Sequence, residues 1–164
     1  HSIRRRQRQM CIRDSWEQTT RTPLIIHVPE TLRDSRWKNS ATICKHPVSL
    51  LDLYPTLINL CGLPANEKNE GRSLAPLVRN PETDWPWPAV ITHSPHWLGT
   101  NHALRSERWH YINYSDGGEE LYDVISDPFQ WYNLSNEPDH AAVKEELKQW
   151  LPKSNAPHFQ GESK

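Results

Sequence analysis

The chain has 164 residues, a net charge of −1 and a hydrophobic fraction of 35%, with a mean hydropathy of −0.83. This length allows one hydrophobic core, or one core and a small satellite. No apolar run approaches the roughly 18 residues of a membrane span, so we expect no membrane insertion, and eight Trp with 14 Pro argue against plain disorder.

Residues 1–15 contain five of the 19 basic residues and one of the 20 acidic residues, so the rest of the chain has an excess of five acidic side chains. A nucleic-acid role would depend on this basic stretch alone, and we expect no nucleic-acid partner. The stretch has neither helical nor strand periodicity. We interpret it as a disordered or non-native leader.

Residues 22–29 form a compact apolar run, TPLIIHVP, bounded by prolines. Such a run is typical of a strand buried on both faces of a parallel sheet. In this chain alone the strand would lack its neighbours, so we expect exposed apolar area and marginal stability. The polar residues 30–46 that follow are interpreted as a surface excursion.

Residues 49–61, SLLDLYPTLINLC, are predicted to be helical. Ser49 and Asp52 have the spacing of a capping box, and Gly62 stands at the C-cap position. Pro55 predicts a single turn followed by a second helix. Apolar residues at spacings of three and four predict one buried face, with Cys61 as a buried thiol; these residues are Leu50, Leu53, Leu57, Leu60 and Cys61.

A short helix is predicted at residues 73–78 with Ser73 as its cap, followed by a proline-rich linker at residues 80–88. The next strand is predicted at residues 89–93, and a loop at residues 94–101 leads into an antiparallel meander. Its three strands are predicted at residues 102–105, 109–114 and 119–124. The turn Ser-Asp-Gly-Gly at residues 115–118 tolerates positive φ, and an amphipathic helix is predicted at residues 139–151.

Side chains that could carry chemistry are few. His93, His96 and His102 could supply three imidazoles, but their spacing is not helical and no carboxylate or Cys lies at a second-ligand spacing. Ser94 lacks the strand-turn-helix context of a nucleophile elbow. From residue types and spacing we therefore predict no catalytic residue and no metal ligand in this chain.

Three segments in order, TRTPLIIHVPE, then HPVSLLDLYPTLINLCGLP with EGRSLAPLV, then NHALRSERWHYINYSDGGEELYDVISDPFQWYNL, resemble the C-terminal part of the sulfatase family. The likeness is to bacterial iduronate-2-sulfatase-like and choline-sulfatase-like members, from about Trp16 to Leu151. At position 12, where the family's last catalytic lysine is expected, the chain has Ile12, and Ser15 stands where a Leu is expected.

The resemblance implies an α/β fold: the C-terminal part of an alkaline-phosphatase-like sandwich, plus a small antiparallel-sheet subdomain with a C-terminal helix. It places residues 16–80 at the end of the catalytic domain, with residues 49–61 packed on its sheet. Residues 81–152 would form the subdomain and residues 153–164 a flexible tail. Formylglycine and calcium, which such enzymes use to cleave sulfate esters, would belong to a part of the parent enzyme absent from this chain, because the chain has no C/S-x-P-x-R motif and no Asp-Asp pair.

The implied partner is a sulfated small molecule or saccharide, and the fragment alone is expected to be inactive. Loops of the C-terminal subdomain border the cleft in this family, which makes Trp97, Asn101 and His102 candidates for substrate contact. A role in bracing the loop and the sheet edge is an equal alternative. A phosphate or phosphonate ester hydrolase of the same superfamily, or a non-catalytic interaction module, stays open as the function. Compartment and oligomeric state are left open.

Overall fold

The computed structural model describes residues 17–33, 37, 43–94 and 99–155. The chain divides into two compact units. The sheet unit comprises Val90–Lys164 with the N-terminal residues up to Arg21, and the helical unit comprises Thr22–Ala89. The division falls after Ala89, whereas the boundary expected from the resemblance lies after residue 80. Residues 81–89 join the helical unit because Trp85 is buried in its core and Trp87 packs against that core.

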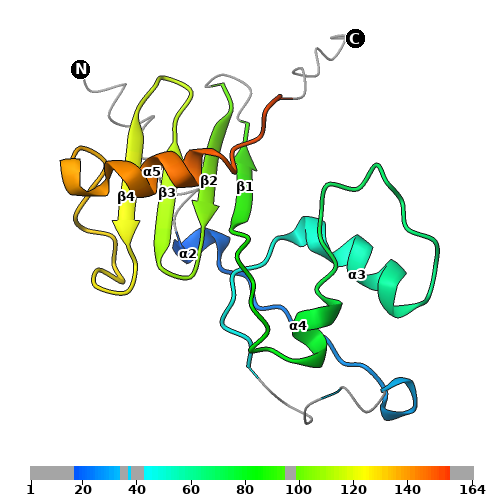
Figure 1. Cartoon of the computed structure of the whole chain (residues 1–164). Coiled ribbons are helices and arrows are strands. Elements are labelled where there is room, and N and C mark those ends of the chain that lie inside the picture. Colours follow the sequence, from blue (N-terminus) through cyan, green and yellow to red (C-terminus); the bar gives the residue numbers. More distant parts are fainter. Residues whose placement is uncertain (1–16, 34–36, 38–42, 95–98, 156–164) are drawn as a thin grey trace. The chain divides into compact units, whose positions relative to one another are not determined.

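The sheet unit is built on four strands in the order β1-β2-β3-β4: β1 Ala89–His93, β2 Asn101–Arg105, β3 Trp109–Asn113 and β4 Glu119–Asp123 (Figure 1). β3 pairs antiparallel with both β2 and β4, so the predicted meander is confirmed. In the turn between β3 and β4, Gly117 has a φ of +83°, a conformation that favours glycine.

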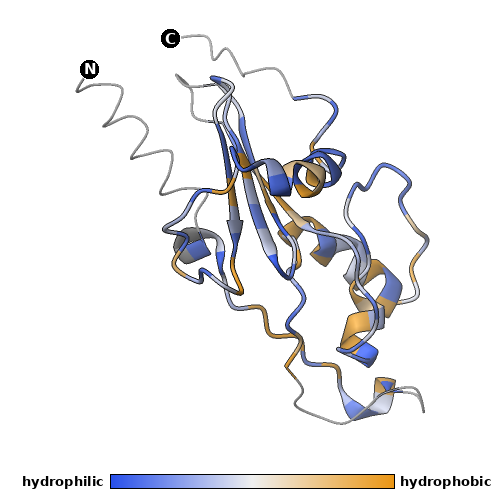
Figure 2. Cartoon of the chain, turned by 60° about the vertical axis from the view of Figure 1, so that its left-hand side comes forward, coloured by the Kyte–Doolittle hydropathy of each residue, from blue (hydrophilic) through white to orange (hydrophobic). Residues whose placement is uncertain are grey.

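Both faces of this sheet are covered. Helix α5 (Ala141–Lys148) follows the short turn η3 (Pro138–His140) and lies on one face, while α2 (Glu17–Thr20) lies on the opposite side (Figures 1 and 2). Alternation along the strands divides the core into two clusters. The α5 face contains Leu104, Tyr111, Leu121 and Leu147, and the other face contains Ala103, Ile112 and Tyr122.

The predicted apolar face of the C-terminal helix is confirmed, because Val143, Leu147, Trp150 and Leu151 all pack in the α5-face cluster. On the other side of the sheet, Arg105 Nε lies 2.9 Å from Glu17 Oε2, which ties α2 to β2. Among the residues that the structure describes, no helix has the length and apolar character needed to cross a membrane.

Glu119 on β4 is bound by Tyr111 of β3 and by two lysines of α5, which join the sheet to this helix. Tyr111 Oη donates to Glu119 Oε1 over 2.6 Å, Lys144 Nζ lies 2.8 Å from Oε2, and Lys148 Nζ lies 2.9 Å from Oε1. Burial alone would raise the pKa of Glu119, but the hydrogen bonds from Lys144, Tyr111 and Lys148 outweigh it and lower the pKa to about 2. Burial raises the pKa of Tyr111, and the Glu119 carboxylate adds to this effect.

Replacement of Glu119 by Gln should reduce the pH dependence of stability. The folded-state pKa lies below the unfolded value, so the contribution of Glu119 is fully present above about pH 4.5 and is lost as the pH falls towards about 2. Urea unfolding of both proteins at about pH 6.5, 4.5 and 3 measures this. We expect the wild-type advantage to shrink with falling pH, whereas the exposed Glu145→Gln control should change far less. An advantage that is constant across the series contradicts the assignment.

The helical unit contains η1 (Glu30–Leu32), η2 (Leu50–Asp52), α3 (Leu53–Leu60) and α4 (Ala75–Arg79). The predicted break before Pro55 is confirmed by the change from η2 to α3, and the capping box of Ser49 and Asp52 is present. Gly62 closes α3 with a φ of +66°. The predicted short helix begins two residues later than expected, at Ala75, with Leu74 rather than Ser73 at its N-cap.

The prediction of a buried strand at residues 22–29 is wrong for this chain. The segment forms no strand, and Ile25 is 89% exposed. A strand needs a neighbouring backbone to receive its N–H and C=O groups, and the described residues of the helical unit contain none apart from Ala89 at the start of β1. The apolar run is exposed, as expected for a strand sequence without its neighbours.

The burial of α3 is also different from the prediction. The polar residues Asp52 and Thr56 are buried, whereas Leu50, Tyr54 and Leu57 are more than half exposed (apolar positions are orange in Figure 2). Cys61, expected to be a buried thiol, is exposed. The buried face is polar because its groups bind the backbone of residues 72–74: Asp52 Oδ1 accepts from Arg72 N and Thr56 Oγ1 from Leu74 N.

Candidate functional site

The predicted site residues Asn101 and His102 open the interior strand β2 at one end of the sheet. Both are nearly buried, with 2% and 6% of their surface exposed. As consecutive strand residues they point to opposite faces of the sheet. They therefore have different surroundings, and each is described separately.

His102 lies on the same face as Leu104. Its Nδ1 is 3.1 Å from Thr92 Oγ1 on β1. Burial lowers the pKa of His102, and a hydrogen bond with Asn155 opposes part of this effect. The neutral imidazole is thus favoured, and this form can donate one hydrogen bond and accept another through its two ring nitrogens.

Asn101 lies on the same face as Ala103, and its Oδ1 accepts a hydrogen bond of 2.9 Å from Ser115 N, at the hairpin between β3 and β4. Gly99 approaches the same hairpin: a Cβ at Gly99 would lie 2.7 Å from Ser115 Cβ, and its φ is +76°. Ser94 Oγ and Thr100 Oγ1 are 3.0 Å apart. The two ends of the β1–β2 connection are therefore held by polar contacts, and Asn101 fixes one of them to the neighbouring hairpin.

The structure places Asn101 and His102 at one end of the sheet, where the interior strand β2 begins, and Trp97 lies outside the described residues. Sequence reasoning missed their partners Thr92, Ser115 and Asn155, because these contacts cross between strands or come from the end of the chain. Substrate contact by Trp97, Asn101 and His102 stays a prediction. The observed contacts of Asn101 and His102 are those of residues that brace a loop.

A metal-binding cluster is not formed by the described side chains. Within residues 17–33, 37, 43–94 and 99–155, no three His, Cys, Asp or Glu side chains are grouped as metal ligands. His96, the middle member of the three-imidazole set, lies outside these ranges.

Replacing Asn101 by Ala should destabilise the sheet unit by about 1 kcal/mol, because it removes the buried acceptor that binds the N–H of the exposed Ser115. Urea unfolding followed by hydrogen exchange in β2 and β3 measures the change. The exposed Asn136→Ala serves as the matched control and should change stability by less than about 0.5 kcal/mol. Equal stabilities of the two variants would show that Asn101 is not a brace.

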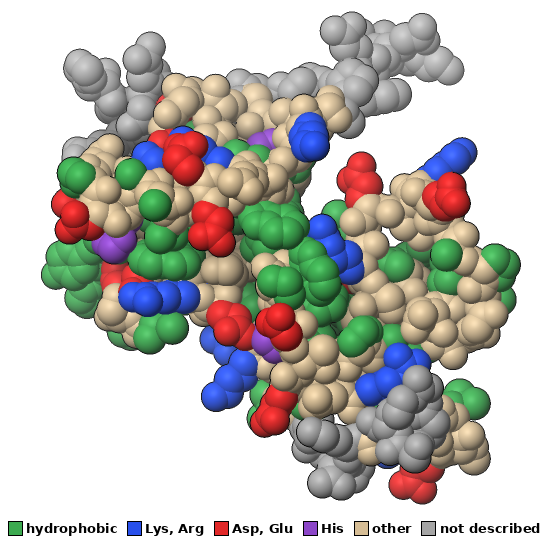
Figure 3. Space-filling view, viewed as in Figure 1, with side chains coloured by type: hydrophobic (Ala, Val, Ile, Leu, Met, Phe, Trp, Pro, Cys, Tyr) green, Lys and Arg blue, Asp and Glu red, His purple; other side chains and the backbone are tan. Residues whose placement is uncertain are grey.

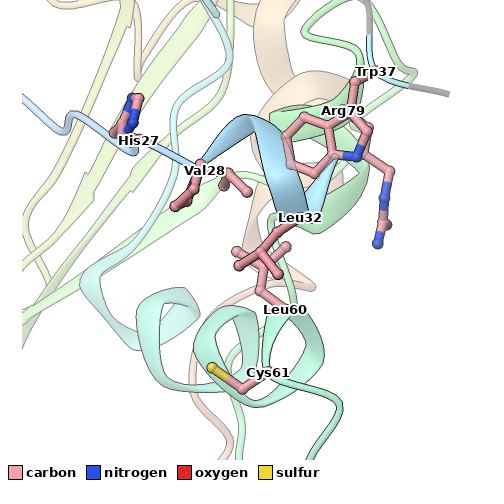
Figure 4. A pocket seen from close by; sticks show the side chains of 8 residues that line it. His27, Val28, Leu32, Trp37, Leu60, Cys61 and Arg79 are labelled. Atoms are coloured by element: carbon pink, nitrogen blue, oxygen red, sulfur yellow. The ribbon is translucent and has the colours of Figure 1, made fainter. Parts of the chain in front are cut away.

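A separate pocket lies in the helical unit. Val28 and Leu32 line it from the segment around η1, Leu60 and Cys61 from the end of α3, and His27, Pro29, Trp37 and Arg79 complete it (Figure 4). Its volume of about 190 Å³ is below the roughly 300–1,000 Å³ of ordinary ligand sites. Its lining is mostly apolar, with His27 and Arg79 as the ionisable nitrogen-bearing side chains.

Comparison with known proteins gives a consistent result. The family model described as N-sulphoglucosamine sulphohydrolase, C-terminal, matches residues 11–156. The match thus begins within residues 1–15, the segment interpreted above as a disordered or non-native leader. A sulfatase of Formosa agariphila is 36% identical over 141 residues, which cover 86% of this chain and 26% of that protein. A Δ4,5-hexuronate-2-O-sulfatase of Bacteroides thetaiotaomicron is 36% identical over 106 residues, 62% of this chain and 22% of that protein.

A solved structure shows the same fold. A protein in complex with its substrate D-glucosamine-2-N,6-O-disulfate superposes with a TM-score of 0.52 at 22% identity, over 60% of this chain and 22% of that one. The chain thus spans about a quarter of the length of these proteins. The predicted fold class, the C-terminal part of an alkaline-phosphatase-like fold with a small antiparallel sheet and a C-terminal helix, is confirmed. The chain belongs to the sulfatase family, and what it matches is the family's C-terminal part.

Proposed function

We propose that this chain is the C-terminal part of a sulfatase that, as a whole protein, hydrolyses sulfate esters on sugars. The observation that carries the proposal is the family match over residues 11–156. The 36% identity to a hexuronate-2-O-sulfatase supports a sulfated saccharide as the substrate class. The chain contains no C/S-x-P-x-R motif for formylglycine, so the proposal assigns the reaction, and a calcium-type cation, to the remainder of the parent.

The exposed apolar residues of the helical unit support the view that a larger protein covers it. A helix in a folded protein normally buries its apolar stripe and exposes its polar face. In η2 and α3 the order is reversed, with Leu50, Leu51, Tyr54 and Leu57 exposed. Ile25 is exposed in the same unit. Several large exposed apolar side chains in one small unit are consistent with a surface that another part of a larger protein covers, and a catalytic domain would do this.

The experiment is the recovery of the reading frame upstream of residue 16, followed by assays of the full-length protein. We expect the frame to encode C/S-x-P-x-R and an Asp-Asp pair. The protein should hydrolyse 4-nitrophenyl sulfate and a 2-O-sulfated unsaturated hexuronate disaccharide faster than 4-nitrophenyl phosphate. The 164-residue chain alone should hydrolyse none of them. Faster phosphate hydrolysis would make the parent a phosphoesterase, and a frame without either motif would make the chain an interaction module.

The same full-length protein tests the proposal that the end of the sheet at which β2 begins borders the substrate cleft. If His102 contacts the substrate, His102→Ala should raise KM on the disaccharide while leaving KM on the smaller 4-nitrophenyl sulfate little changed. If His102 only braces this end of the sheet, Thr92→Val, which removes its hydroxyl partner, should reproduce the effect of His102→Ala on both substrates. An unchanged KM in both variants excludes this end of the sheet from substrate binding.

A further inference from the structure

The loop that follows β4 exposes four large apolar side chains on a short stretch of chain. Ile125, Phe129, Trp131 and Tyr132 are between 63% and 74% exposed. Phe129 and Trp131 stack on one another, with ring centroids 5.6 Å apart and an interplanar angle of 30°. We call residues 125–132 the aromatic loop. In Figure 3 apolar side chains (green) gather at the left, over the part of the sheet unit where Figure 1 draws this loop.

The exposure does not come from a loosely held segment. Gln130, between the two stacked rings, is 2% exposed and has a φ of +57°, a left-handed conformation that few side chains adopt. Its Oε1 accepts a hydrogen bond of 3.0 Å from Nδ1 of the buried His110 on β3. The buried Gln130 therefore anchors the loop to the sheet while the residues on both sides of it point outward.

Backbone contacts complete the anchoring. Gln130 N donates to Asp127 O and Tyr132 N to Asp127 Oδ2, at 3.1 and 2.9 Å. At the start of the loop, Ile125 N donates to Asp123 Oδ1 over 3.1 Å. A loop held in this way presents its aromatic rings without a further ordering cost, which is the property of a pre-organised contact surface.

The charges beside the loop indicate what it contacts. The loop carries Asp127 and begins next to Asp123, and the guanidinium of Arg108 is already paired with Asp123, 2.8 Å from Oδ2. Since Arg108 compensates the charge of Asp123, Asp127 is the carboxylate of the loop that would match an anionic, sulfated saccharide poorly. Trp, Tyr and Phe are instead the residues enriched at the centres of protein–protein contacts.

We propose that the aromatic loop is a docking surface for the upstream part of the parent sulfatase, which rests on the proposed function. The Formosa agariphila relative devotes 26% of its length to the region matched here, so most of such a protein is available to cover the loop. The exposed rings Phe129, Trp131 and Tyr132 are the contact residues. Gln130 and His110 are positioning residues that set the loop conformation.

Hydroxyl-radical footprinting tests the proposal on two proteins, the 164-residue chain and the full-length parent. We expect the oxidation rates of Phe129 and Trp131 to fall by about threefold or more in the parent, because a contact that excludes water also excludes the radical. Trp109, half-buried against Arg108 in the same unit, is the internal control and should keep its rate. Equal rates for Trp131 in both proteins overturn the proposal.

A double variant gives a second, independent measurement. F129S/W131S should lower the unfolding temperature of the full-length parent and leave that of the 164-residue chain unchanged, because the rings are exposed in the chain alone. A decrease of the same size in both proteins overturns the proposal, since the rings would then act within the chain.

Two other occupants are distinguished by the 164-residue chain. Self-association in sedimentation that F129S/W131S abolishes would make the occupant a second copy, and binding of a sulfated heparin disaccharide that the same variant abolishes would make it a saccharide. Either result overturns the proposal. Hydrolysis of 4-nitrophenyl sulfate by the wild-type parent is measured separately and tests the proposed function. If the parent is active but Trp131 is not protected from oxidation, the docking proposal is wrong and the proposed function stands.

Discussion

Leu104→Ala should lower the free energy of unfolding of the sheet unit by about 2–5 kcal/mol. Leu104 has no exposed surface and lies in the cluster between the sheet and α5, with Tyr111, Leu121 and Leu147. Tyr111 on β3 is its partner in the strand register, and β2 is hydrogen-bonded to β1 on one side and to β3 on the other. The surrounding structure therefore has little freedom to collapse into the space left by the removed methyl groups.

The loss can be measured by urea unfolding, with hydrogen exchange of the β2, β3 and β4 amides to assign it to the sheet unit. Ile125→Ala is the matched control, because Ile125 is a branched aliphatic residue of the same unit but is 68% exposed. It should cost less than about 0.5 kcal/mol. Similar losses for the two variants would mean that the sheet and α5 do not form a packed core.

The meander could be predicted because its signals are local. Residues 109–114 are rich in aromatic and β-branched side chains, and the turn at residues 115–118 has the glycine that a positive φ requires. Each of these features acts between residues that are adjacent in the chain or joined by a tight turn. The C-terminal helix is similar, since the spacing of Val143, Leu147 and Trp150 determines which face packs on the sheet.

The run at residues 22–29 could not be predicted in the same way. Its composition indicates a strand buried on both faces, yet whether it forms one depends on neighbouring strands, which a local sequence pattern does not contain. The apolar stripe of η2 and α3 has the same dependence. Leu50 and Leu57 are exposed in this chain, and they would be buried, as predicted, where a larger protein supplies the covering surface. In both places the predicted burial requires neighbouring structure that this chain does not itself provide.

For the candidate site, sequence reasoning selected Asn101 and His102 but not the groups that hold them. Ser115 lies 14 residues from Asn101 and Asn155 lies 53 residues from His102, and their contacts depend on the sheet register and on the path of the chain after α5. Neither can be derived from spacing alone. The exposure of the rings in the aromatic loop could not be predicted either, because the loop conformation depends on the buried Gln130 and on its hydrogen bond to His110 of β3.

Asp52→Ala should be the most damaging single substitution in the helical unit, with an expected loss of about 2–4 kcal/mol. The buried carboxylate accepts from Ser49 N over 2.9 Å and from Arg72 N over 2.8 Å. Alanine leaves both N–H groups without this acceptor and removes the capping box at the start of η2. Because Arg72 lies 20 residues further along the chain, the same change detaches the segment that leads into α4.

Asp52→Asn separates these two contributions, because an amide has one acceptor oxygen where the carboxylate has two. It should retain one of the hydrogen bonds and lose about half as much stability as Asp52→Ala. Asp84→Ala, at an exposed carboxylate of the same unit, is the control and should change stability by less than about 0.5 kcal/mol. Hydrogen exchange should show the largest increase at Arg72 N and Leu74 N. If Asp52→Ala resembles the control, the polar interior of α3 does not hold this unit together, and the exposure of its apolar face would need another explanation.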